Sequence, residues 1–157
     1  PRAHIGYHQE DHWALEWEGH WEEIKDEQAV LRVSRRSSGP GNALRFTFVG
    51  TELQLVVHRS PQGGVLRVSI HGQTPTDIAL QSEVAEYGVL IPLAQGLRDG
   101  AHRVEMVTAG EPGTQVDIDG LLVRRTHSVW LSYALIPASA VVLAALLFGF
   151  RRKRGQE

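Results

Sequence analysis

Residues 43–57 read ALRFTFVGTELQLVV, two runs of largely alternating apolar and polar side chains joined by Gly50 and Thr51. Alternation with a period of two places the apolar side chains of a β-strand on one face. A Gly-Thr pair between two such runs permits a tight chain reversal. This stretch therefore predicts two consecutive strands, each with one buried face.

Further apolar runs follow at a spacing of roughly ten residues, at 65–70, 88–93, 103–107 and 115–123. The chain holds 16 glycines and seven prolines, most of them between these runs, as in PQGG at 61–64 and GEPG at 110–113. These residues would interrupt helices, whereas a sheet uses them in turns. The pattern predicts an all-β domain over residues 13–126, either a β-sandwich or a jelly roll.

Five blocks of this region, in their order, resemble the galactose-binding-like jelly-roll domains of surface proteins, which include carbohydrate-binding modules. The blocks are LEWEGHW at 15–21, ALRFTFVGT at 43–51, VSIHG at 68–72, GLRDGAHRV at 96–104 and VDIDGL at 116–121. The resemblance implies a jelly-roll β-sandwich, with His71 departing from the Asp that usually precedes the glycine of that turn. Because related jelly rolls hold calcium in loops, it also makes Asp119, beside Gly120, a candidate calcium ligand.

Residues 129–150, VWLSYALIPASAVVLAALLFGF, contain no charge. As a helix this stretch is about 33 Å long, enough to cross a hydrocarbon core of about 30 Å. Four basic residues follow at once, as is typical of the cytoplasmic side: Arg151, Arg152, Lys153 and Arg154. We therefore expect a single-pass protein of the cell membrane, with a transmembrane helix at 127–150 and a basic cytoplasmic tail at 151–157. The β domain, with an N-terminal extension at 1–12, would lie outside.

Small side chains recur at four-residue spacing in the predicted span, at Ala134 and Ala138, Ala140 and Ala144, and Ala145 and Gly149. Such spacing lets another helix approach closely, and Pro137 is expected to bend the span. These features predict membrane lipid and other membrane protein subunits as partners. The first hypothesis for function is therefore a non-catalytic accessory or scaffold subunit of a larger membrane complex.

Four aromatic residues are candidates for contact with a ligand or partner: Trp13, Trp17, Trp21 and Tyr87. Exposed aromatic rings stack against sugars or bury into a partner surface. The alternative is structural, with Trp17 facing the core of a sandwich and Trp21 capping it. Together with the resemblance, these residues predict the alternative function, a surface-anchored carbohydrate-binding module.

His4, His8 and His12 would share one face if this segment were helical, a spacing that can bind zinc or copper. Gly6 weakens that helix, and the alternative is a pH-sensitive tail or an assembly contact. Asp117 and Asp119 share one face of a predicted strand, where a solvated edge or the calcium-binding turn is expected. No cofactor other than calcium is indicated.

The sequence lacks the residues that several classes of function require. The absence of cysteine excludes disulfides and thiolate metal sites, and GxSxG, P-loop, GxGxxG and HExxH motifs are absent from the sequence. His102 has no nucleophile or base spaced around it and is expected to bond a neighbouring turn. Residues 1–128 hold 12 basic and 17 acidic residues, a net charge of 12 − 17 = −5, which opposes binding to nucleic acid. Neither an enzyme nor a nucleic-acid-binding protein is expected.

Overall fold

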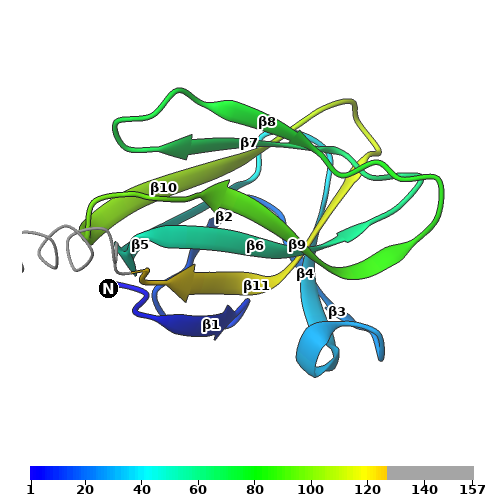
Figure 1. Cartoon of the computed structure of the whole chain (residues 1–157). Coiled ribbons are helices and arrows are strands. Elements are labelled where there is room, and N and C mark those ends of the chain that lie inside the picture. Colours follow the sequence, from blue (N-terminus) through cyan, green and yellow to red (C-terminus); the bar gives the residue numbers. More distant parts are fainter. Residues whose placement is uncertain (127–157) are drawn as a thin grey trace, which may run out of the picture. The chain divides into compact units, whose positions relative to one another are not determined.

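The structure, a computed structural model, describes residues 1–126 apart from the side chain of Leu31. These residues form one compact unit in which two antiparallel sheets pack face to face (Figure 1). The prediction of an all-β sandwich is confirmed, whereas the predicted transmembrane helix lies outside the described residues. Within residues 1–126, no helix has the length and apolar character needed to cross a membrane.

Sheet A has five strands in the order β2-β5-β10-β7-β8. They are β2 (Glu16–Glu18), β5 (Ala43–Gly50), β7 (Val65–Ile70), β8 (Thr76–Ala79) and β10 (Gly100–Ala109). The predicted turns at 50–51, 61–64 and 110–113 lie at the end of β5, before β7 and after β10, where the chain passes between this sheet and the other one.

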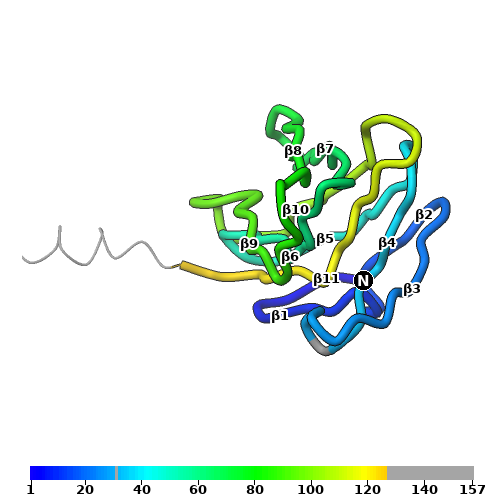
Figure 2. The backbone as a smooth tube through the Cα atoms, turned by 90° about the vertical axis from the view of Figure 1, so that its right-hand side faces the viewer, coloured from blue at the N-terminus to red at the C-terminus, as the bar shows by residue number. Residues whose placement is uncertain are grey.

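Sheet B has the order β3-β4-β11-β6-β9, with β1 beside β11. Its strands are β1 (Gly6–Gln9), β3 (Glu22–Lys25), β4 (Val33–Ser38), β6 (Glu52–Arg59), β9 (Glu86–Ala94) and β11 (Gln115–Arg124). A short 3-10 turn, η1 (Val30–Arg32), precedes β4. Figure 2 shows β1 running beside β11, so part of the expected N-terminal extension belongs to the sandwich.

The core lies between the sheets and is built from the alternating side chains of the central strands. On β5 these are Leu44, Phe46 and Phe48, and on β6 they are Leu53, Leu55 and Val57; all six are at most 4% exposed. Burying an aliphatic or aromatic side chain of this size contributes about 1.5–3 kcal/mol. The apolar alternation of residues 43–57 therefore accounts for the centre of both sheets.

Two predicted turn features are present. Gly50 ends β5 and Thr51 separates it from β6, with the Thr51 N–H donating to the carbonyl of Arg124 at 2.9 Å. Nε2 of His102 lies 2.9 Å from the carbonyl oxygen of Arg98, which confirms the predicted bond to a neighbouring turn.

Candidate functional site

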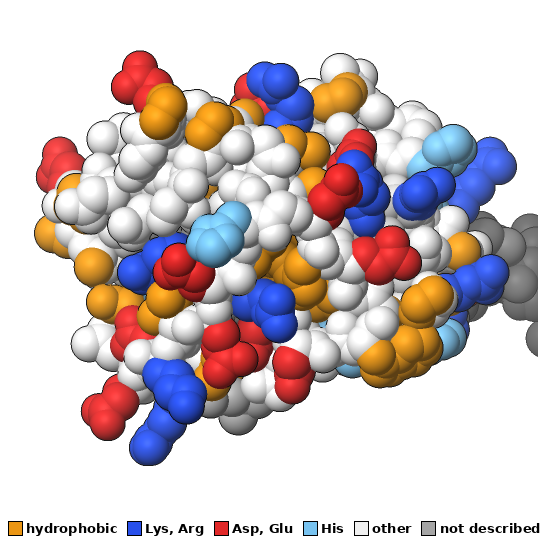
Figure 3. Space-filling view, turned by 180° about the vertical axis from the view of Figure 1, so that it is seen from behind, with side chains coloured by type: hydrophobic (Ala, Val, Ile, Leu, Met, Phe, Trp, Pro, Cys, Tyr) orange, Lys and Arg blue, Asp and Glu red, His pale blue; other side chains and the backbone are white. Residues whose placement is uncertain are grey.

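A row of charged and hydroxyl side chains crosses the outer face of sheet A, on the side turned away from the core. The strand register pairs Glu16 with Arg45, Arg45 with Glu105, and Glu105 with Ser69. Cross-strand partners have their side chains on the same face of a sheet, so these residues form one row over four strands. In the rear view of Figure 3, acidic and basic side chains stand next to one another.

Arg45 lies in the middle of this row, and two carboxylates hold it in place. Its Nε donates a hydrogen bond to Oε1 of Glu105 at 2.6 Å, and its Nη1 donates to Oε2 of Glu18. These bonds, with that to Glu105 contributing most, raise the pKa of Arg45 above its ordinary value. A guanidinium has five N–H donors, so these two bonds leave donors for a ligand.

Two hollows open beside Arg45 on this face. One of about 260 Å³ is lined by Pro1, Ala14, Glu16, Arg45, Phe46, Thr47 and Arg103. The other, of about 180 Å³, is lined by Arg45, Ser69, His71, Arg103 and Glu105. Both include Arg45 and Arg103, so the hollows adjoin at these two side chains. We call the two hollows together the polar groove; Arg103 is its exposed cation.

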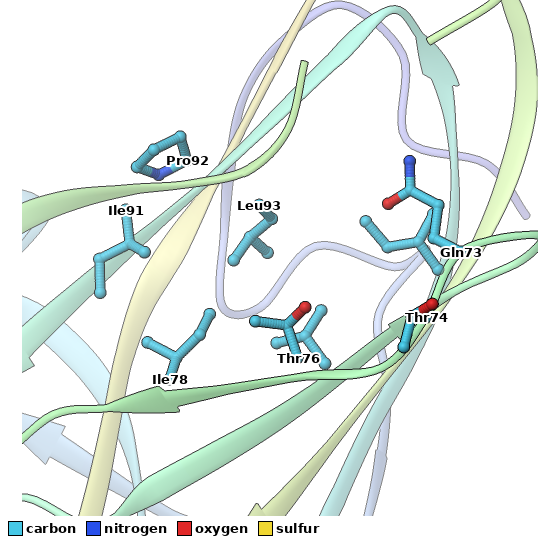
Figure 4. A pocket seen from close by; sticks show the side chains of 9 residues that line it. Gln73, Thr74, Thr76, Ile78, Ile91, Pro92 and Leu93 are labelled. Atoms are coloured by element: carbon cyan, nitrogen blue, oxygen red, sulfur yellow. The ribbon is translucent and has the colours of Figure 1, made fainter. Parts of the chain in front are cut away.

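A third hollow, the lateral hollow, lies at the side of the sandwich between the edge strands β8 and β9. It measures about 100 Å³ and is lined by Val68, Ile70, Gln73, Thr74, Thr76, Ile78, Ile91, Pro92 and Leu93. Figure 4 shows Gln73 and Thr74 at one end of this space and Ile78 and Ile91 at the other. Its lining mixes aliphatic and polar side chains, and Thr76 lies between Thr74 and Ile78.

The opposite side of the sandwich, at β2 and β3, is closed by two tryptophans. The rings of Trp17 and Trp21 meet edge to face with 4.7 Å between centroids, and both pack against the core. Nε1 of Trp17 donates to the carbonyl of Glu10 at 2.9 Å. Of the predicted contact residues, Trp17 and Trp21 thus complete the edge of the core, whereas Trp13 and Tyr87 are 69% and 40% exposed.

The outer face of sheet B carries a second charged group, which is buried. Arg36 donates to Oδ2 of Asp117 from Nε at 2.9 Å and from Nη2 at 2.6 Å. Nδ1 of His58 lies 3.9 Å from the same oxygen. Nε2 of His58 lies 3.2 Å from Oδ2 of Asp119, close enough for an ion pair but without the alignment of a hydrogen bond. We call Arg36, His58, Asp117 and Asp119 the buried cluster.

The prediction of a solvated edge at the two aspartates is wrong, because Asp117 and Asp119 are 7% and 0% exposed. The pairing of β11 with β6 shifts between Ile118 and Gly120, so Asp119 is the extra residue of a β-bulge. The backbone N–H of Val30, in η1, lies 3.4 Å from Oδ2 of Asp119. The segment before β4 therefore covers this carboxylate.

His58 is the titratable centre of the buried cluster. Burial alone would lower its pKa, but the contact with Asp119 and the negative charges of Asp117 and Asp26 outweigh burial and raise it. The ring of Tyr87 lies edge to face on the imidazole with 4.5 Å between centroids. The buried cluster lines none of the three hollows described above.

The three N-terminal histidines do not form the helix face considered for zinc or copper. The rings of His8 and His12 lie 4.4 Å apart, and Nε2 of His8 lies 2.6 Å from the carbonyl oxygen of His4. In the part of the chain that the structure describes, no group of three or more His, Cys, Asp or Glu side chains is placed to hold a metal ion. Asp119, the calcium candidate, faces His58 instead.

The remaining predicted residues lie outside the described residues. They are the helix-packing positions Ala134, Ala138, Ala140, Ala144, Ala145 and Gly149, and the topology positions Arg151, Arg152, Lys153 and Arg154.

The polar groove was not predicted from the sequence. Its residues occupy alternate positions of strands whose other positions are apolar, as in Arg45 and Thr47 of β5 and Arg103 and Glu105 of β10. That alternation marks them as outward-facing. It does not say which strands become neighbours, so the row across four strands has no signal in the sequence of any one strand.

Comparisons with known proteins agree with this fold, although no curated protein matches the sequence. The family two carbohydrate esterase from Cellvibrio japonicus aligns with a TM-score of 0.57 and 23% identity, over 73% of this chain and 32% of that one. A two-domain esterase active on acetylated mannans, co-crystallised with mannopentaose, aligns with a TM-score of 0.61 and 10% identity, over 77% and 37%. A family 35 carbohydrate binding module from Clostridium thermocellum aligns with a TM-score of 0.55 and 14% identity, over 74% and 96%.

At these identities the structural matches establish the fold alone. The chain covers 32% and 37% of the two esterases, so it corresponds to about a third of each. The Carbohydrate esterase 2 N-terminal family matches residues 31–129, which is more than half of the sequence, and the chain belongs to that family.

Proposed function

We propose that residues 1–126 form a carbohydrate-binding domain whose ligand lies in the polar groove. The observation that carries this proposal is the row over β2, β5, β10 and β7, which presents carboxylate, guanidinium and hydroxyl groups side by side. Each sugar hydroxyl both donates and accepts hydrogen bonds, so a sugar chain needs both kinds of partner. The ion pairs of Arg45 hold these groups in place beforehand, which reduces the entropy cost of binding.

The charges of the groove favour a neutral polysaccharide. Glu16, Glu18 and Glu105 bring three carboxylates to the groove and its rim, against the two guanidinium groups of Arg45 and Arg103. The domain as a whole carries a net charge of 12 − 17 = −5. A polymer rich in uronic acids would therefore be repelled as it approached.

Two relatives support a sugar as the ligand class. One is the mannan esterase crystallised with mannopentaose, and the other is a carbohydrate binding module that shares this fold over 96% of its own length. The comparisons therefore favour the carbohydrate-binding alternative. They offer no support for an accessory subunit of a membrane complex.

We assign no catalytic role to the polar groove. Ser69, His71 and Glu105 line the same hollow, but no hydrogen bond joins any two of their side chains among the described residues. A nucleophilic hydroxyl needs its base within hydrogen-bond reach. An esterase in which such a domain occurs would accordingly carry out its chemistry elsewhere in its chain.

Calorimetric titration with cello-, manno- and xylo-oligosaccharides tests the proposal. The full chain is kept in a detergent without a sugar headgroup, because residues 129–150 are predicted to span a membrane. Arg103→Gln should weaken binding about tenfold, since a hydrogen bond from a charged donor contributes about 1.5 kcal/mol.

Arg67→Gln is the matched control. Arg67 lies two residues before Ser69 on β7, on the same face, but it pairs with Asp77 and lines neither hollow. It should bind like the native protein. The proposal fails if no oligosaccharide binds, or if Arg103→Gln binds as well as Arg67→Gln.

We also propose that the domain is displayed outside the cell on the predicted membrane span, with residues 151–157 in the cytoplasm. The support is the uncharged stretch followed by four basic residues. Protease added to intact cells should cut the β domain and spare an epitope at residues 151–157. Cleavage of that epitope in intact cells would reverse the topology.

A further inference from the structure

An exposed tryptophan lies next to one end of the polar groove. Ala14 lines the larger of the two hollows, and the residue before it is Trp13. The Cα atoms of consecutive residues lie about 3.8 Å apart. Trp13 is 69% exposed, whereas Ala14 is 2% exposed. A ligand that leaves this hollow past Ala14 therefore meets the indole ring of Trp13.

The indole of Trp13 is held by a neighbouring histidine. It lies beside the imidazole of His12 with 5.5 Å between ring centroids and 31° between the ring planes. His12 in turn lies edge to face on His8, which is 9% exposed, with 4.4 Å between centroids. Nδ1 of His12 accepts a hydrogen bond from the backbone N–H of Ala14 at 3.2 Å. His12 thus contacts both the indole and the wall of the groove, and it restricts the movement of the ring.

A restricted aromatic ring suits the part of a sugar that the polar groove leaves without a partner. The row of carboxylate, guanidinium and hydroxyl groups in the groove bonds to sugar hydroxyls. The C–H bonds on the face of a pyranose ring are apolar and slightly positive, whereas the face of an indole is negative. Because His12 already restricts the indole of Trp13, stacking on it costs less conformational entropy than stacking on a freely moving side chain.

We infer that Trp13 forms an aromatic subsite that extends the polar groove, where the face of one pyranose ring stacks on the indole. This inference rests on the proposed function and adds an apolar contact for a further unit of the same sugar chain. Neighbouring strands lie about 4.8 Å apart, so the row over β2, β5, β10 and β7 is about 14 Å long. A sugar chain of several units is therefore needed to cover the row and reach Trp13.

The experiment titrates the full chain with mannopentaose and cellohexaose. Trp13→Ala should weaken binding about tenfold, the effect of re-exposing about 55 Å² of apolar surface, whereas Trp13→Phe keeps a flat ring and should retain most of the affinity. Acrylamide quenching of tryptophan fluorescence provides a measurement that a merely structural role would not change. Bound sugar should shield an indole from quenching in the native protein, and Trp13→Phe should lose that shielding even if Trp13→Ala fails to fold.

Leu90→Ala is the matched control for the loss of an exposed apolar side chain. Leu90 is 51% exposed, but it belongs to β9 of sheet B and lines neither hollow of the polar groove. This variant should bind both sugars like the native protein. If Trp13→Ala binds as tightly as Leu90→Ala, or if bound sugar leaves the quenching of the native protein unchanged, the inference is overturned while the proposed function still stands on Arg103→Gln. If neither sugar binds, both fail together.

Discussion

The two outer faces of the sandwich use the same chemistry, arginine paired with carboxylate, at different depths. On sheet A the side chains of Arg45 and Glu105 are 37% and 43% exposed. On sheet B the side chain of Asp117 is 9% exposed, and that of its partner Arg36 is 30% exposed. Exposed pairs contribute little stability and remain available to a ligand, whereas breaking a buried pair leaves an uncompensated charge. The comparison separates the face of the proposed ligand site, where charged groups are exposed, from a face where a carboxylate is buried by its partners.

The largest expected effect comes from removing the carboxylate that the buried cluster shares. Asp117→Ala leaves Arg36 and His58 without their common partner, at a cost of about 3 kcal/mol, because buried pairs broken on one side typically lose that much. Urea unfolding measures the change. Glu105→Ala on the other face is the control and should leave the urea midpoint almost unchanged; equal losses would erase the distinction between the faces.

A smaller loss of stability should follow from adding a side chain at Gly120, next to the β-bulge that carries Asp119. A Cβ at Gly120 would lie 2.5 Å from the carbonyl oxygen of His8 and 2.6 Å from the hydroxyl of Tyr7. Gly120→Ala should therefore push β1 away from β11 and cost about 1–3 kcal/mol in unfolding experiments. Gly100→Ala, in β10 of sheet A, has no atom within 4 Å of the added carbon and should be close to neutral. A neutral Gly120→Ala would mean that β1 is loosely held.

A weaker effect should appear as a dependence of the thermal midpoint on pH, which arises from His58 on sheet B. The folded state raises the pKa of His58, so this stabilisation is fully present below the ordinary value and is lost as the pH rises through the raised value. The thermal midpoint should fall as the pH rises above the ordinary value of 6.5, and His58→Gln should remove this slope.

His12 gives the opposite control for this titration. Burial, followed by the neighbouring His8, lowers its pKa, so its contribution is present above the ordinary value and is lost as the pH falls. His12→Gln should therefore remove a rise of the thermal midpoint below the ordinary value of 6.5 and leave the fall above that value in place. An unchanged slope in His58→Gln would show that the buried cluster does not titrate in this range.

The smallest effect is expected at an exposed pair on sheet A. Nε and Nη2 of Arg67 donate to the two carboxylate oxygens of Asp77 at 2.7 and 2.8 Å, and these bonds lower the pKa of that carboxyl. Arg67→Gln should return the Asp77 pKa toward its ordinary value of 3.8, seen by NMR titration, without moving the thermal midpoint at neutral pH. A clear drop in the midpoint would place this pair among the stabilising ones.

Most of the sandwich could be predicted, and the exceptions share a cause. The alternation of residues 43–57 predicted β5 and β6, and the glycine-rich turns predicted the reversals, because both depend on neighbours in the chain. The burial of Asp117 and Asp119 was missed, since it depends on η1 folding over a bulge and on His58 from another strand. From the sequence alone, a charged residue in a strand is expected to face solvent, because the sequence does not show which distant residue pairs with it.

The sequence by itself determined which side chains of each strand face the core, because a β-strand turns alternate side chains to opposite faces whatever lies beside it. Only the tertiary structure decided which strands became neighbours. That choice aligned Glu16, Arg45, Glu105 and Ser69 into one row, and it placed Trp17 and Trp21 at one edge while leaving the other edge open. Register between distant strands depends on the packing of the whole core, so no local pattern specifies it.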